Sequence, residues 1–291
     1  MLRRFCSSWC SGADARAILV VGLLAALTLP GVTRRIYASD ELQYVAFLRS
    51  LWFDRDVSFD NEYRQFVANG TTRDPAFAAT FIEPVTETGR RRSFATIGSA
   101  ILWAPFYAVA DAGVRIARLL GSPVPADGYS PPYISAVCLG SAVYGLLALC
   151  LSWCAARRVL AAAGLAPGPH AALAAAAVGL GSPLLFYMYI APGFAHATSA
   201  FAVSAFILAW LVVRARWDLA GFVVLGSLAG LMAMVREQDA FIVAGPAVDF
   251  GWRVVKERRW RAIGPAAAGA AAAALIYLPQ AAAYLALNGR V

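Results

Sequence analysis

The sequence predicts an all-α, polytopic membrane protein with about seven transmembrane helices, and three observations indicate this class. Of the 291 residues, 60% are hydrophobic and 14% are charged, whereas soluble domains have about 45–50% apolar and about 25% charged residues. Seven apolar runs approach the roughly 20 residues that cross a bilayer. One long polar stretch, 38–131, separates the first run from the others. We expect a single transmembrane domain over 1–291, with 38–131 as an extracytoplasmic loop containing interfacial or re-entrant helices.

The first predicted helix, 16–37, follows Arg3-Arg4 and ends beside Arg34-Arg35. Basic residues before an apolar run also occur in cleaved signal peptides, so a signal peptide is an alternative for this segment. The flanking arginines and the later apolar runs favour an uncleaved anchor. The five cysteines have no metal-site spacing and predict no disulfide framework.

Two adjacent carboxylates, Asp40 and Glu41, directly follow the first helix. A carboxylate costs about 2.5–3.5 kcal/mol at the centre of a membrane helix and less toward the interface, so acidic residues at this edge are functional candidates. The simpler alternative is that the pair ends the helix and faces water. Residues 42–53 carry apolar side chains at helical spacing together with aromatic rings, which predicts a helix on the membrane surface.

The acidic run 54–62 has some of the spacing of a calcium-binding loop. It lacks the required glycine and glutamate, since Phe59 and Gln65 occupy those positions. We therefore expect a solvated acidic turn. Segment 93–118 is nearly long enough to cross the membrane, but Pro105 interrupts it and charged residues follow.

The remaining predicted spans are 132–156, 170–190, 194–214, 218–236, 239–254 and 263–287; the span 239–254 is short and contains Asp249. Arginine clusters set the orientation, because basic residues are retained on the cytoplasmic side. The N-terminus and the clusters at 157–158, 214–216 and 253–261 are all cytoplasmic only if 93–118 makes no net crossing. A full crossing would place the later clusters outside. We expect a multi-pass protein of a bacterial inner membrane with a cytoplasmic N-terminus.

The net charge of +8 does not indicate nucleic-acid binding, because the basic residues are short arginine clusters between apolar runs and Lys256 is the only lysine. Instead, the predicted topology collects further candidates on the outer face. They are Arg90, Arg91, Arg92, His196, Arg236 and Gln238. Adjacent guanidinium groups suit phosphate or lipid headgroups, and binding to membrane lipids alone is the simpler interpretation of the arginine run.

Several of these segments resemble the GT-C superfamily of polyprenyl-phosphate-dependent glycosyltransferases, which includes protein O-mannosyltransferases and aminoarabinose transferases. The resemblance rests on Ser-Asp-Glu after the first helix, Gly-x-x-x-Leu-x-Ala-Pro-Phe at 98–106, Gly-Ser-Pro-Leu-Leu-Phe-Tyr at 181–187 with Pro-x-x-x-His at 192–196, and Gly-x-x-Ala-Gly-Leu-x-x-x-Val-Arg-x-Gln-Asp at 226–239. It covers most of the chain.

The resemblance implies transfer of a sugar from a polyprenyl-phosphate carrier to a lipid, glycan or protein acceptor on the extracytoplasmic face. Asp40, with Glu41 beside it, would be the catalytic base or a ligand of a divalent cation (Mg²⁺ or Mn²⁺). The arginine run 90–92, Arg236, Gln238 and His196 would bind the substrate. Relatives often carry a second acidic residue where this chain has His196, and they are usually longer, so the chain is expected to represent an N-terminal portion.

Two other functions remain open from the sequence. A transporter or lipid flippase would place its polar residues near the bilayer midplane, commonly within two related halves. Here the polar residues cluster at helix ends, and no internal repeat is apparent. A non-catalytic remnant of a transferase is the third reading.

Overall fold

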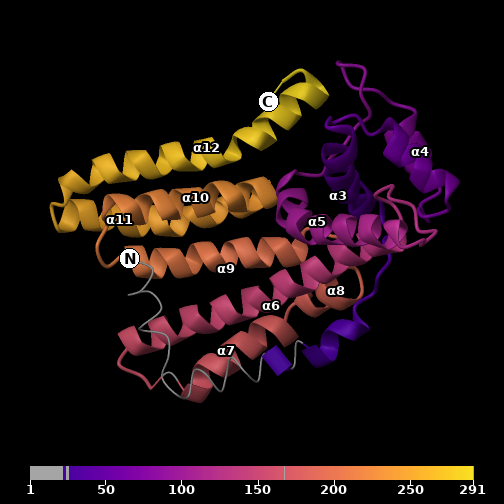
Figure 1. Cartoon of the computed structure of the whole chain (residues 1–291). Helices are drawn as coiled ribbons and strands as arrows, with labels where there is room; N and C mark the ends of the chain where they lie inside the picture. Colours follow the sequence, from indigo (N-terminus) through magenta and orange to yellow (C-terminus); the bar gives the residue numbers. More distant parts are fainter. Residues whose placement is uncertain (1–21, 24–25, 167, 291) are drawn as a thin grey trace.

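The computed structural model describes residues 22–23, 26–166 and 168–290. These residues form helices and connecting segments, with one isolated bridge between Val85 and Arg91 and no strand among them. The predicted all-α class is therefore confirmed. Most of the helices run side by side as a bundle, and the segment around 38–130 lies at one end of it (Figure 1).

The bundle is built from α6 (Pro131–Ala162), α9 (His196–Val213), α10 (Leu219–Val235) and α12 (Ile263–Asn288), with α7 (Gly168–Leu180), α8 (Leu184–Tyr189) and α11 (Ala244–Lys256) beside them. The closest packing is between α10 and α12. A Cβ at Gly226 would overlap the backbone of Gly269, and one at Gly230 would overlap that of Ala273. Small residues here let two apolar helices approach closely, as they do in membrane proteins.

Four helical segments are long and apolar enough to cross a membrane: Gly98–Leu119, Pro131–Ala162, His196–Val213 and Trp260–Asn288. Helices α7 and α10 are apolar but shorter. The predicted span 170–190 is two helices, because the chain breaks at Ser182-Pro183 and a proline lacks the N–H that would continue the helix. The predicted span 239–254 is the 3-10 helix η4 (Glu237–Val243) followed by α11.

The first part of the predicted helix 16–37 lies outside the described residues, and its described end is shorter than expected. The chain forms the 3-10 turn η1 (Leu29–Gly31) and then runs without helix from Val32 to Tyr37. Pro30 and Gly31 account for the early stop, because both disfavour continuing a helix. The junction before Asp40 is therefore an extended connection of several residues.

The segment 38–130 folds into α3 (Ser39–Arg49), a π-helix (Ser50–Asp54), α4 (Asp60–Ala68), a second π-helix (Ala78–Ile82) and α5 (Gly98–Leu119). Its interior is aromatic, and these rings are fully buried: Phe47, Phe59, Tyr63, Phe77, Trp103 and Tyr107. The apolar face predicted for 42–53 packs largely against this aromatic core, with Leu42, Val45 and Phe47 fully buried.

Helix α5 is continuous through Pro105, so the predicted interruption at that residue is wrong. Contacts with α6 flank the proline: the Trp103 indole donates to the Ser141 hydroxyl at 2.9 Å, and Tyr144 donates to the carbonyl of Leu102 at 2.8 Å. These contacts offset the one hydrogen bond that a proline removes from a helix interior. At its start, α5 contacts the first turn of α9 and the last turn of α10.

The bundle has two chemically different ends (Figure 1). The first, here called the loop end, carries α3, α4, α5, the start of α9 and the ends of α10 and α12. The second, the arginine end, carries the connections α6–α7, α9–α10 and α11–α12; the arginines at 157–158, 214–216 and 253–261 lie in these connections or in the last turns of the helices that lead into them. All arginine clusters predicted to share one side of the membrane thus lie at one end of the described bundle.

Candidate functional site

Glu41 is fully buried, and its carboxylate accepts hydrogen bonds from three backbone N–H groups. Oε2 accepts from Tyr37 at 3.0 Å and from Ala38 at 3.1 Å, and Oε1 accepts from Gly193 at 3.1 Å. The first two bonds satisfy donors that the start of a helix otherwise leaves unpaired. Burial raises the pKa of Glu41, while the three backbone donors oppose the rise. Glu41 therefore fastens the start of α3 to the turn before α9.

The turn that receives Glu41 has no space for a side chain at Gly193. A Cβ there would lie 2.9 Å from both Glu41 and Ile36. The Pro192-Gly193 pair thus ends the connection from α8 and also lets α3 approach the first residue of α9. That residue is His196.

Asp40 is exposed, unlike its neighbour, and no hydrogen bond of its carboxylate is found among the described residues. Tyr44 follows one helical turn later on the same face of α3 and is half-buried. Burial raises the pKa of Tyr44, and the next largest cause is the negative charge of Asp40; Arg236 lowers this pKa and Asp239 raises it. The charges of Asp40 and of the segment 236–239 therefore act on one phenol, although they lie almost 200 residues apart in the sequence.

His196 and Arg236 are in direct contact. Nη1 of Arg236 lies 3.0 Å from Nδ1 of His196, and since a guanidinium has no acceptor, the imidazole nitrogen accepts. The other side of the imidazole lies against the ring of Tyr187, with 3.8 Å between ring centroids. Arg236 leaves the helical path at the end of α10, with φ −150° and ψ 119°, which turns its side chain toward α9.

The residues after Arg236 connect it to two further helices. Oδ2 of Asp239 accepts from the Ser199 hydroxyl at 2.5 Å, and Oε1 of Glu237 accepts from the Tyr277 hydroxyl at 2.6 Å. Gln238 between them is exposed. The predicted outer-face residues Asp40, His196 and Arg236 therefore meet at the loop end. We call the group Asp40, Tyr44, His196, Arg236, Glu237 and Asp239 the loop-end cluster.

The arginine run 90–92 is divided among three environments. Arg90 donates to the carbonyl of Ala286 at 2.7 Å, near the end of α12. Arg91 pairs with Asp60 of α4 at 2.6 Å and also donates to the carbonyl of Ile82. Arg92 is exposed, and no ion pair of its guanidinium is found in the described part of the chain. Arg90 and Arg91 therefore make intramolecular contacts, whereas Arg92 faces solvent.

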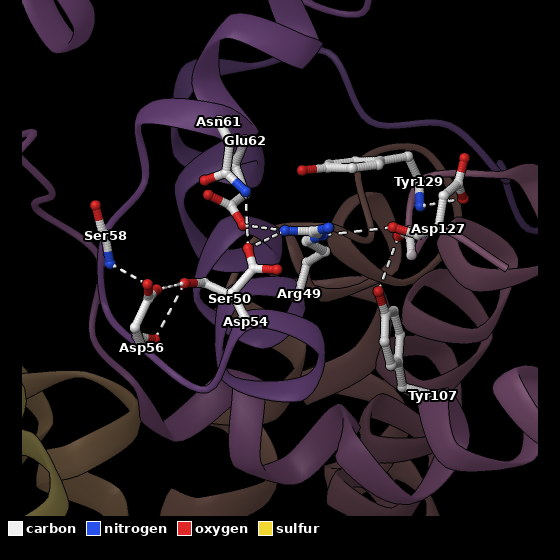
Figure 2. Close-up of polar contacts among 11 residues, drawn as sticks. Arg49, Ser50, Asp54, Asp56, Ser58, Asn61, Glu62, Tyr107, Asp127 and Tyr129 are labelled. Carbon is white, nitrogen blue, oxygen red and sulfur yellow. Dashed lines mark hydrogen bonds and ion pairs between the residues drawn. The ribbon is translucent and has the colours of Figure 1, made fainter.

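A second polar cluster lies inside the folded loop and centres on Arg49 (Figure 2). Its Nη1 contacts Asp54 and lies 2.9 Å from Oε1 of Glu62, and its Nε donates to the carbonyl of Asp127 at 3.4 Å. Glu62 is fully buried, and its other oxygen has no hydrogen-bond partner. Burial raises the pKa of Glu62 to about 7. The expectation of a solvated acidic turn at 54–62 is therefore wrong at Glu62, which joins α4 to α3 through Arg49.

The structure also has an open apolar groove of about 610 Å³ at the loop end. It runs between α5 and the first turns of α6, and its walls include Phe106, Val109, Val114, Pro132 and Leu139. Such a lining suits hydrocarbon rather than a polar ligand.

A divalent cation at Asp40 has few protein ligands to complete its coordination. No three His, Cys, Asp or Glu side chains lie together as metal ligands anywhere in the described ranges. The other carboxylates of the loop-end cluster, Glu237 and Asp239, accept hydrogen bonds from Tyr277 and Ser199. Because Mg²⁺ and Mn²⁺ favour several oxygen ligands, these residues alone do not form their site.

Sequence reasoning did not identify Tyr44, Ser199 or Tyr277. The sequence does indicate Tyr44, because it lies at position i+4 from Asp40 and this spacing places both residues on one helix face. Tyr277 and Tyr284 are seven residues apart in an alanine-rich helix, which also places them on one face. Ser199 has no such signal.

Comparison of the chain with protein-family models, with curated proteins and with solved structures finds no match.

Proposed function

We propose that the chain transfers a sugar from a polyprenyl-phosphate carrier to an acceptor hydroxyl, and that the loop-end cluster is the site of transfer. The observation that supports this most is the contrast between the two acidic neighbours. Glu41 is fully engaged with the backbone, whereas Asp40 is exposed, and its charge and that of the cationic Arg236 both act on the phenol of Tyr44. A free carboxylate beside a fixed cation supplies a proton acceptor and a partner for a phosphate in one place.

In the proposed reaction, Asp40 takes the proton of the acceptor hydroxyl while the hydroxyl oxygen bonds to the anomeric carbon of the sugar. The bond between that carbon and the phosphate oxygen breaks, and its electron pair leaves with the polyprenyl phosphate. General-base catalysis of this kind contributes about 10²–10⁴-fold. Arg236 would neutralise the charge that develops on the departing phosphate, aided by Arg92 and Gln238 as exposed polar groups. His196 would hold Arg236 in place.

The apolar groove between α5 and α6 supports a lipid-linked donor, because its apolar lining suits a polyprenyl chain. In this proposal the acceptor is a lipid, glycan or protein hydroxyl on the outer face of a bacterial inner membrane. The count of about seven spans belongs to the same proposal, and so does the position of 93–118 without a net crossing, although its helix α5 is long and apolar enough to cross. Contacts of α5 with the first turn of α9 and the last turn of α10 are consistent with that position.

The decisive experiment compares the wild-type chain with Asp40→Asn after reconstitution into liposomes. Transfer from a panel of polyprenyl-phosphate sugars to added acceptors should fall by about 10²–10⁴-fold in the variant, because Asn cannot take the proton. Glu83→Gln is the matched control, since Glu83 is also exposed in the segment 38–130. Transfer at the wild-type rate by Asp40→Asn would show that Asp40 has no catalytic role.

The same liposomes separate the alternative functions. Lipid scrambling or solute uptake without sugar transfer would favour a flippase or transporter, and the absence of any binding to polyprenyl phosphate would favour a non-catalytic remnant. Addition of a chelator tests the divalent cation. If Asp40 holds Mg²⁺ or Mn²⁺, which would neutralise charge on the donor phosphate, chelation should abolish transfer and either metal should restore it.

A further inference from the structure

The arginine end of the bundle contains a second cavity, far from the loop-end cluster along the helices (Figure 1). It has a volume of about 530 Å³ and lies between the α9–α10 turn and the α11–α12 turn. Its lining residues are Arg216, Trp217, Arg258, Arg259, Trp260, Arg261 and Ala262. Four of the seven residues are arginines and none is acidic.

Most of this positive charge has no counterion within the described residues. Arg259 pairs with Glu257 at 2.7 Å, whereas no ion pair is found there for Arg216, Arg258 or Arg261. These three side chains are exposed, so like charges gather around one hollow without compensation.

The acidic residues nearby in the sequence are already engaged. Asp249 accepts from Arg214 and Arg253 and also from the indole of Trp210. Asp218 accepts from the backbone of Gly221 at 2.7 Å and caps the start of α10. No carboxylate of the described residues is therefore left to neutralise Arg216, Arg258 and Arg261, and an anion from outside the chain could do so.

Trp217 gives an independent sign of a missing partner. It is 4% exposed, and its indole N–H is buried without a hydrogen-bond partner. A buried donor left unpaired is costly, so such groups are uncommon in a folded protein unless a ligand or water satisfies them. The ring packs against Phe222 and Phe250, with centroid distances of 5.2 and 5.1 Å, and these two rings also contact each other, so this wall of the cavity is fixed.

The geometry points to a binding site for a phosphate group, and we propose that the cavity at 216–217 and 258–262 binds one. Guanidinium groups stay charged and offer paired donors that match phosphate oxygens, and an indole N–H adds a neutral donor. An inorganic phosphate and the headgroup of an anionic phospholipid share this chemistry. Trp260, which lines the cavity, is 57% exposed, and Trp252 of the neighbouring helix α11 is 67% exposed; tryptophan favours the level of lipid headgroups.

The test uses the full chain purified in detergent. Native mass spectrometry measures retention of added phosphatidic acid, and calorimetry measures binding of inorganic phosphate in the same detergent. We expect Arg216→Gln/Arg261→Gln to bind at least tenfold more weakly than the wild type. The control Arg158→Gln removes an arginine at the same end outside the cavity and should bind normally. Arg216→Lys/Arg261→Lys keeps the charge and should bind more tightly than the glutamine pair.

The two measurements separate the sources of the phosphate. Arginine-dependent binding of phosphatidic acid alone identifies a lipid headgroup, and arginine-dependent binding of inorganic phosphate identifies a soluble ligand; either supports the site. Equal binding by the wild type and Arg216→Gln/Arg261→Gln overturns the proposal, and so does the absence of binding to both probes. Circular dichroism and thermal unfolding confirm that the variants compared are folded.

Discussion

Adjacent carboxylates at 40 and 41 have opposite environments because neighbouring residues of a helix point about 100° apart. Glu41 faces the protein and meets the backbone of Gly193, while Asp40 faces outward beside the charges of 236–239. The sequence predicts that this pair matters, because two acids follow an apolar run. It cannot tell which of them faces inward, since that depends on a turn about 150 residues away.

Glu41→Ala should therefore destabilise the fold. The change leaves the N–H groups of Tyr37, Ala38 and Gly193 without their acceptor. The Gly193 N–H is buried, and an unpaired buried group costs about 1–3 kcal/mol. Thermal unfolding in detergent should show a clear decrease in the midpoint. Asp40→Ala is the matched control, because Asp40 is exposed, and it should unfold like the wild type. Equal midpoints for both variants would contradict the role given to Glu41.

Glu62 predicts a pH-dependent stability. Its pKa is raised from 4.5 to about 7 in the folded chain, so the folded state binds the proton more tightly than the unfolded state. The contribution to stability is full below about pH 4.5 and is lost as the pH rises through about 7. Between about pH 5 and about pH 8 the loss should reach about 2 kcal/mol.

Glu62→Gln should remove this dependence, because glutamine keeps the shape and has no titrating proton. The free energy of unfolding, measured at both pH values for wild type and variant, gives the difference directly. Glu83→Gln, an exposed site, should retain the wild-type dependence. A Glu62→Gln variant with the same pH dependence as the wild type would assign the effect to another group.

The elements of the loop end are held together by contacts between distant parts of the chain. Thr88 and Arg90 donate to the carbonyls of Leu287 and Ala286, which fastens the segment 85–91 to the end of α12. The length of the apolar runs predicts α6, α9, α10 and α12 well. It does not predict that 38–130 folds around an aromatic core. That core joins rings from α3, α4, α5 and the segments between them, and the spacing of residues within one helix does not show which rings of the others it contacts.

Arg90 and Arg92 differ in their contacts, so their substitution should have different effects. Arg90→Gln should lower stability by about 1 kcal/mol, because it weakens a side-chain hydrogen bond to α12. Hydrogen exchange in 85–91 should accelerate. Arg92→Gln should leave stability unchanged and raise the KM for the polyprenyl-phosphate sugar severalfold, since its exposed guanidinium is the one free to meet phosphate. A stable Arg90→Gln variant, or an unchanged KM for Arg92→Gln, would contradict these assignments.

The whole molecule separates two kinds of charge along the bundle axis. The loop end mixes acids, a histidine, phenols and Arg236, whereas the arginine end is basic around its cavity (Figure 1). Sequence clusters predict this polarity, because arginines recur in alternate connections between apolar runs. Run length alone predicts one span over 170–190, although Pro183 marks a break within it, and it predicts a helix to residue 37 where the structure ends the helical path at Gly31. The local chemistry of proline and glycine decides both positions.

The contact between Arg236 and His196 restricts how the imidazole can take part in proton transfer. Its Nδ1 lone pair is occupied by a donor that is permanently charged, so a proton can arrive there only if the guanidinium withdraws. Nε2 then carries the hydrogen of the neutral ring and can only donate a hydrogen bond to a substrate or solvent. Phosphate capture by Arg236 and basicity at Nδ1 therefore exclude each other, and relaying a proton through His196 would require the arginine to swing away first.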